Sequence, residues 1–135
     1  MLFRSETEVS AALSLVWNLY TSPAHIIHWN AASADWHTTS ATVDLKVGGQ
    51  FCYHMAAKDG SFGFDFAGTW TVVEPCTRLE YTFGERTASV LFRQQADVVV
   101  VTVTFEAETQ HSIEQQQAGW QAILNNFARY VAANS

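Results

Sequence analysis

The stretch that decides the fold is SIEQQQAGWQAILNNFARYVAANS, residues 112–135. Its apolar residues recur every three or four positions and therefore fall on one face of a helix, whereas polar side chains occupy the other face. The apolar face carries Ile113, Trp120, Leu124, Phe127 and Val131. This spacing predicts one long amphipathic helix from Ile113 to Ala133.

The start of this helix has a recognisable capping pattern. Ser112 stands before the first apolar residue, and Gln115 follows three positions later. In a capping box the Ser oxygen accepts a backbone N–H of the first turn, and the Gln side chain reaches back to the cap. The predicted helix rises about 31 Å, and seven strands about 4.8 Å apart span about 29 Å. One helix can therefore cover a whole seven-stranded sheet.

Alternating segments precede the helix and predict a series of strands. Apolar residues occupy every second position, and glycine, proline or aspartate residues mark most of the reversals. We expect strands within residues 3–9, 36–45, 51–55, 64–72, 79–83, 90–92 and 99–105. Gly48 and Gly49 mark a tight hairpin turn. Gly68 lies inside a strand pattern, where glycine usually indicates a bulge, a bend or close backbone approach.

The pattern between the first two strands is helical. Residues 11–20 repeat apolar side chains at helical spacing, and Ser10 is positioned to cap them. Ser22 and Pro23 form a typical N-cap and first-turn pair, which predicts a second short helix to about Asn30. The expected fold is α+β, a single helix-grip domain over residues 1–135. In it a curved antiparallel sheet of about seven strands wraps the C-terminal helix.

Composition excludes several classes of function. The chain has 135 residues, of which 48% are hydrophobic and 15% charged, and its net charge is −6. Nucleic acids and anionic membranes bind clustered cations, so neither is an expected partner. The N-terminus lacks the features of a signal peptide and no apolar run could span a membrane, so we expect a cytoplasmic protein. Cys52 and Cys76 have no CxxC spacing and are expected as free thiols.

Four stretches carry a family resemblance: VWNLYTSPAHIIHWN (16–30), DLKVGGQF (44–51), GTWTVVEPCTRLEYTF (68–83) and GWQAILNNFARYV (119–131). They resemble the SRPBCC superfamily, which includes START and birch-pollen-allergen-like helix-grip proteins. Within it they are similar to the branch named for the activator of heat-shock-protein ATPase. The resemblance implies a deep cavity between the C-terminal helix and the sheet, in which members bind lipids, sterols, polyketides or aromatics, and some catalyse cyclisations.

Carried onto this chain, the resemblance implies a set of cavity-facing residues with two tryptophans near the mouth. The expected ligand-binding residues are Trp29, Trp36, Phe51, Tyr53, Met55, Phe64, Phe66, Trp70, Tyr81, Phe83, Phe92, Trp120, Leu124 and, as a polar member, Gln117. Gln117 interrupts the apolar helix face, so it is either an anchor for the ligand or an exposed residue over the sheet edge. Gly119 needs a reason in a helix interior, such as close approach of a neighbouring element or ligand.

Three functions fit these observations. The favoured one is binding of a small hydrophobic ligand, of aromatic, acyl or polyketide-like character. The second is a cofactor-free cyclase or hydrolase in the same cavity, for which Asp35, Asp44 and Glu80 are weak acid–base candidates. The third is a stress-related partner of a chaperone ATPase, which rests on family analogy alone. A homodimer is an open option.

No cofactor or metal is expected. His25, His28, His37 and His54 occur in neighbouring segments, but a zinc site needs three or four ligands that converge. His54 alternates with Tyr53 and is expected on the opposite face of the strand. No catalytic residue is assigned, because neither thiol begins a helix and no GxSxG nucleophile turn occurs.

Overall fold

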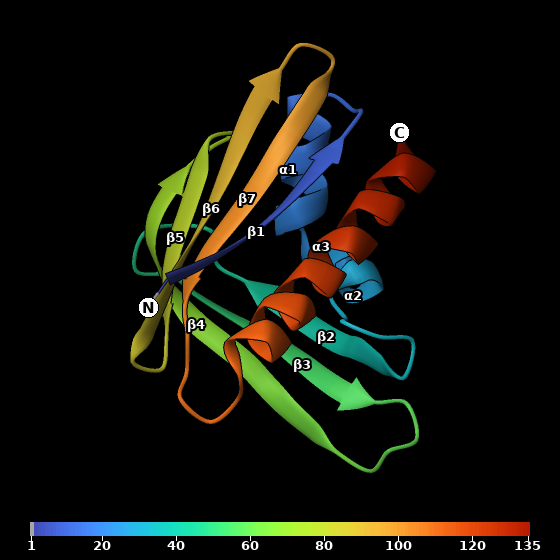
Figure 1. Cartoon of the computed structure of the whole chain (residues 1–135). Coiled ribbons are helices and arrows are strands. Elements are labelled where there is room, and N and C mark those ends of the chain that lie inside the picture. Colours follow the sequence, from blue (N-terminus) through green and yellow to red (C-terminus); the bar gives the residue numbers. More distant parts are fainter. Residues whose placement is uncertain (1) are drawn as a thin grey trace.

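The computed structural model describes residues 2–135 (Figure 1). Its elements are β1 (Leu2–Val9), α1 (Leu13–Thr21), α2 (Pro23–Trp29), β2 (Trp36–Val43), β3 (Gln50–Ala57), β4 (Gly63–Glu74), β5 (Arg78–Phe83), β6 (Arg86–Gln95), β7 (Val98–Glu106) and α3 (Ile113–Asn134). This order confirms the predicted α+β fold with two short helices after the first strand. Among residues 2–135, no helix combines the length and apolar character that crossing a membrane requires.

The sheet is antiparallel throughout, in the order β1-β7-β6-β5-β4-β3-β2. Strands β2 to β7 follow one another as a meander, and β1 joins at the β7 edge with Ser5 opposite Val103. The alternation in β7 places Val99, Val101, Val103 and Phe105 in the core, where each is almost fully buried. The sheet curves strongly, and α3 lies across its concave side (Figure 1). Helices α1 and α2 lie beside the C-terminal half of α3.

Helix α3 buries the C-terminal part of its predicted apolar face, whereas Ile113 at its start is 42% exposed and Trp120 is half-buried. Leu124, Phe127 and Val131 are buried, and the Ser112 side chain accepts the backbone N–H of Gln115 at 3.1 Å. The prediction that the Gln115 side chain reaches back to the cap is wrong. Gln116 reaches back instead, and its side-chain amide donates to the carbonyls of Glu108 and His111. The helix entry is therefore tied to the preceding loop.

The start of α1 differs from the prediction. Its N-cap is Ala12, which has no side chain to accept a hydrogen bond, so Ser10 does not cap this helix. Ser22 and Pro23 do occupy the N-cap and first-turn positions of α2. The Ser22 hydroxyl, however, donates to Asn18 at 2.9 Å rather than capping the helix.

Close contacts explain one glycine in strand β4 and one in the loop between β2 and β3. A Cβ at Gly68 would lie 2.2 Å from the Thr82 carbonyl oxygen and 2.8 Å from the Phe51 ring, which confirms close approach within β4. Gly48 has a φ of +85°, as a tight turn requires, whereas a Cβ at Gly49 would meet the Asp44 carbonyl oxygen at 2.1 Å. The pairing of β4 with β5 also shifts register just beyond Trp70. These irregularities let the sheet bend around α3.

Candidate functional site

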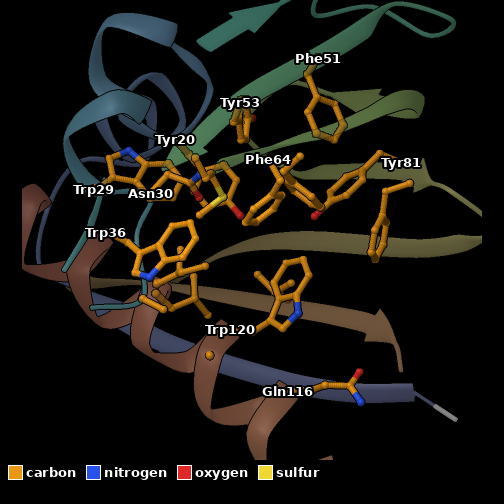
Figure 2. A pocket seen from close by; sticks show the side chains of 18 of the residues that line it. Tyr20, Trp29, Asn30, Trp36, Phe51, Tyr53, Phe64, Tyr81, Gln116 and Trp120 are labelled. Carbon is orange, nitrogen blue, oxygen red and sulfur yellow. The ribbon is translucent and has the colours of Figure 1, made fainter. Parts of the chain in front are cut away.

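A cavity of about 490 Å³ lies between α3 and the concave face of the sheet. Its lining consists of Tyr20, Trp29, Asn30, Ala32, Ser33, Trp36, Phe51, Tyr53, Met55, Phe64, Phe66, Trp70, Tyr81, Phe83, Arg86, Val103, Gln115, Gln116, Gly119, Trp120, Ile123 and Leu124. Side chains from β3, β5, α2 and α3 face the same space (Figure 2). Small-molecule sites typically have volumes of about 300 to 1,000 Å³, so this cavity has room for a ligand of that class.

Strand alternation builds the wall that the sheet contributes. Phe51, Tyr53 and Met55 occupy every second position of β3, and Tyr81 and Phe83 do the same in β5. The central ring is Phe51, whose centroid lies 4.8 Å from that of Trp70 and 5.0 Å from that of Tyr81. The wall is therefore a continuous layer of edge-on and tilted aromatic contacts.

Helix α3 and the segment around α2 supply the opposite wall. Trp120 stacks on Phe105 at 4.6 Å and presents its other side to the cavity. Trp29 is held in place because its indole N–H donates to the Leu19 carbonyl at 2.9 Å. Trp36 lies at the mouth with Phe64, 6.0 Å between ring centroids. Phe64 is 44% exposed, so this end of the cavity opens to solvent.

All but two of the residues predicted to face the cavity line it. The exceptions are Phe92 and Gln117. Phe92 is buried, but its ring packs 5.2 Å from Trp17 and 5.4 Å from Tyr20, because α1 covers that part of the sheet. The prediction that Phe92 points to the inner side of the sheet is correct. The prediction did not anticipate that α1 would cover it there.

Gln117 lies outside the cavity at the edge of the sheet. Its side-chain amide donates to the Arg4 carbonyl at 3.0 Å, and Gln121, one turn later, bonds both the N–H and the carbonyl of Glu6. These two glutamines pair with the free backbone groups of edge strand β1, which would otherwise be open to another strand. Gln117 is therefore not among the lining residues, and of its two predicted positions the one over the sheet edge is correct.

For Gly119, the predicted close approach of a neighbouring element is wrong. A Cβ built there meets no atom within 4 Å, so no neighbouring element approaches it. Gly119 nevertheless lines the cavity. Its missing side chain leaves this part of the helix face open to the cavity.

Several polar lining residues were not predicted from the sequence. Arg86 is the clearest case, although its position in the alternating pattern of β6 indicates the side to which it points. Ala88, Val90 and Phe92 are buried on alternate positions, so Arg86, two residues before Ala88, points to the same inner side. Gln115 was expected in the helix cap and Gln116 was given no role, because sequence alone does not locate the end of the cavity.

Three tyrosines, Tyr20, Tyr53 and Tyr81, bring hydroxyls to the cavity and are called the cavity tyrosines below. None of the three hydroxyls is hydrogen-bonded to another residue within 2–135. Burial raises the pKa of each well above its ordinary value, and mutual proximity adds to the shift for Tyr53 and Tyr81. They are therefore neutral hydrogen-bonding groups at physiological pH and not bases.

Carboxylates, imidazoles and thiols are missing from the lining formed by the described residues. Asp44 and Glu80 face outward, with oxygens 3.7 Å from Lys46 and 3.1 Å from Arg78. Asp35 is exposed and also lies outside the lining. Arg86 is the only formally charged side chain in the lining contributed by residues 2–135. The cavity therefore offers aromatic surface, neutral hydroxyls and one cation.

The histidines and cysteines occupy separate places. His25 bonds the Tyr130 hydroxyl at 2.7 Å, and His54 bonds Asp65 at 2.7 Å on the outer face of the sheet, as its alternation predicts. No three His, Cys, Asp or Glu side chains of residues 2–135 are grouped to hold a metal ion. Cys52 and Cys76 are free thiols. Burial raises the pKa of Cys52, and the Asp65 carboxylate adds to that shift, which makes its thiol a poor nucleophile.

Comparison with known proteins places these features in a family. The family model described as "Activator of Hsp90 ATPase homolog 1-like protein" matches residues 10–132. No curated protein matches the chain. The solution structure of the AHSA1-like protein of Aeromonas hydrophila is 51% identical, with a TM-score of 0.94 over 99% of this chain and 94% of that one.

Two further structures extend the comparison. A Cytophaga hutchinsonii protein is 42% identical, with a TM-score of 0.84 over 97% of this chain and 92% of its own. A Nitrosomonas europaea protein is 19% identical, with a TM-score of 0.85 over 99% and 96% of the two chains, and therefore shares the fold. The family match and the two higher identities agree with the resemblance in the sequence: the chain belongs to the AHSA1-like family of the SRPBCC superfamily.

Proposed function

We propose that this protein binds a small apolar ligand, aromatic or acyl in character, in the cavity between α3 and the sheet. The observation that carries the proposal is the cavity of about 490 Å³ with an almost unbroken aromatic wall. A core that served only stability would be packed without such a space, because voids forfeit dispersion contacts and cost stability. An apolar ligand recovers those contacts when it fills the cavity.

The chemistry of the lining favours binding over acid–base catalysis. A general base needs a pKa near the working pH, whereas burial holds the cavity tyrosines in the neutral form. The lining contains no carboxylate or imidazole among the described residues that could take a proton in their place. A binding site for a mostly apolar ligand also needs a few polar groups that orient it, and neutral hydroxyls and amides can serve as such groups.

Exposed aromatics at the mouth support entry of such a ligand. Phe62 is 61% exposed, and its ring lies 6.0 Å from Trp36 and 6.3 Å from Phe64, which both line the cavity. Clustered exposed apolar side chains often mark functional surface. Here they continue the aromatic wall outward, so an apolar molecule meets the same kind of surface at the entrance and inside.

Two measurements test this proposal directly. Native mass spectrometry of the purified protein should reveal a co-purified small molecule. Titration with N-phenyl-1-naphthylamine, a neutral fluorescent probe, should give saturable binding with quenching of the tryptophans that line the cavity. Absence of both a co-purified molecule and saturable binding would refute the proposal.

A cavity-filling variant locates the binding. Gly119 lines the cavity with open space at its Cβ, so Gly119→Phe should fill part of the cavity and abolish or strongly weaken probe binding without removing any side chain. Ala118→Phe is the matched control, because Ala118 is exposed and lies outside the lining. Both variants should remain folded by circular dichroism. Equal probe affinity in the Gly119 variant and the wild type would place the probe elsewhere.

A further inference from the structure

Arg86 occupies an unusual position in this cavity. It is half-buried, and its guanidinium lies 4.4 Å from the centre of the Phe83 ring, which itself lines the cavity. The stacking fixes the guanidinium against the aromatic wall, as cation–π contacts do. Arg86 is thus part of the wall, at the end of the cavity where β5 turns into β6.

The hydrogen-bonding capacity of Arg86 is mostly unused. A guanidinium has five N–H donors, and the described residues take one, through Nη1 to the Glu106 carbonyl at 3.3 Å. No carboxylate of the described chain lies within 4.0 Å of its nitrogens. The nearby acids are engaged elsewhere, since Glu106 accepts two hydrogen bonds from Thr87 and Glu108 accepts two from His111.

A second donor faces the same region. The Tyr81 hydroxyl is unbonded within residues 2–135 and reaches the cavity, whose lining it shares with Arg86. Burial and the neighbouring tyrosines raise the pKa of Tyr81, and the positive charge of Arg86 offsets part of that rise, as expected for groups close together. A guanidinium and a neutral phenol offer donors to the same acceptor. The described part of the cavity lining contains no carboxylate that would compete for these donors.

We propose that the ligand of this cavity is an amphipathic anion, with an apolar body against the aromatic wall and a carboxylate or similar oxyanion that pairs with Arg86 and accepts a hydrogen bond from Tyr81. The proposal deepens the proposed function and rests on it. Planar guanidinium groups bind carboxylates with two parallel hydrogen bonds, which gives orientation as well as affinity. With a net charge of −6, the protein does not attract anions as a whole, so affinity for the oxyanion must come from this local pair.

Matched probe pairs isolate the contribution of the anionic group. N-phenyl-1-naphthylamine and 8-anilinonaphthalene-1-sulfonate share their aromatic body and differ in one sulfonate. Dodecanol and dodecanoate form a second pair, measured by displacement of the neutral probe, and they differ in the carboxylate. In wild-type protein the anionic member of each pair should bind more tightly, by about tenfold.

Three variants test the role of Arg86 and Tyr81. Arg86→Met keeps an unbranched side chain over Phe83 but removes the charge, and it should lower affinity for the anionic probes about tenfold while changing the neutral ones less than about twofold. Arg86→Lys keeps the charge without the planar fork and should give an intermediate loss. Tyr81→Phe removes only an unbonded hydroxyl, so it should weaken anion binding in a protein of unchanged melting temperature.

Arg78→Met is the matched control. Arg78 lies in β5 outside the lining, where it pairs with Glu74 and Glu80, so its loss changes the net charge equally without touching the cavity. Its probe affinities should equal those of the wild type. If Arg86→Met weakens binding of neutral and anionic probes alike, or of neither, the proposed pairing of Arg86 with an oxyanion is refuted. The proposal that the cavity binds an apolar ligand would still stand. If the neutral probe binds neither the wild type nor any variant, the proposed function itself is refuted.

Discussion

Truncation of Phe127 to alanine should lower the free energy of unfolding by about 3 to 5 kcal/mol. Phe127 is fully buried on α3, and its ring lies 5.1 Å from Tyr20 and 4.9 Å from Trp29. Loss of the buried ring removes about 2 to 3 kcal/mol of transfer free energy. The cavity left behind adds about 1 to 2 kcal/mol, because the Trp29 hydrogen bond to Leu19 limits relaxation.

Urea unfolding followed by circular dichroism measures this loss. The midpoint should fall with an unchanged dependence on urea, which shows that stability and not the extent of unfolding has changed. Phe62→Ala is the control, because it deletes the same atoms from a residue that is 61% exposed. It should cost less than about 1 kcal/mol.

The result that would refute this reasoning is a loss below about 1 kcal/mol for Phe127→Ala. Such a result would mean that the apolar face of α3 does not pack against α1 and α2. A similar loss in both variants would show that the measurement reports removal of any phenyl ring and not burial. Probe binding gives an independent readout, since Phe127 lies outside the cavity lining.

The same substitution should have opposite effects at two glycines. Gly119→Ala should raise the free energy of unfolding by about 0.5 to 1 kcal/mol, because its Cβ enters open space, and a decrease would contradict this. Gly68→Ala should lower it by about 1 to 3 kcal/mol through clashes with backbone and ring atoms; a neutral result in urea unfolding would show that β4 can move away. Ser112→Ala should cost about 1 kcal/mol by removing the α3 cap, seen as a lower melting temperature, and an unchanged one would exclude that role. The folded state holds the protons of the cavity tyrosines more tightly than the unfolded state, since their pKa is raised. Their contribution to stability is therefore complete below about pH 10 and is lost above it. Urea midpoints between about pH 8 and about pH 11 should fall steeply at the alkaline end, and a flat profile would contradict the burial of these hydroxyls.

Much of the fold could be read from local periodicity. The helical spacing in α3 and the alternation in β3 and β5 identified which face of each element is buried, whereas the middle of β7 is buried on both faces. These patterns are local because a side chain's direction follows from the helix or strand geometry alone. The same reasoning placed most of the aromatic wall on the inner side of the sheet, and it predicted the close contact at Gly68.

Tertiary structure decided what each buried face meets. Phe92 and Phe83 are both buried on inner positions, yet α1 covers the first and the cavity borders the second. Gln117 lies on α3 near the apolar face, but its amide finds the backbone of β1 because the helix overhangs that edge. Arg86 points to the same side of β6 as the buried residues of that strand. It reaches the cavity because the strand begins there. Periodicity fixes the side to which a residue points, whereas contacts between segments far apart in the chain decide whether helix, solvent or ligand space lies on that side.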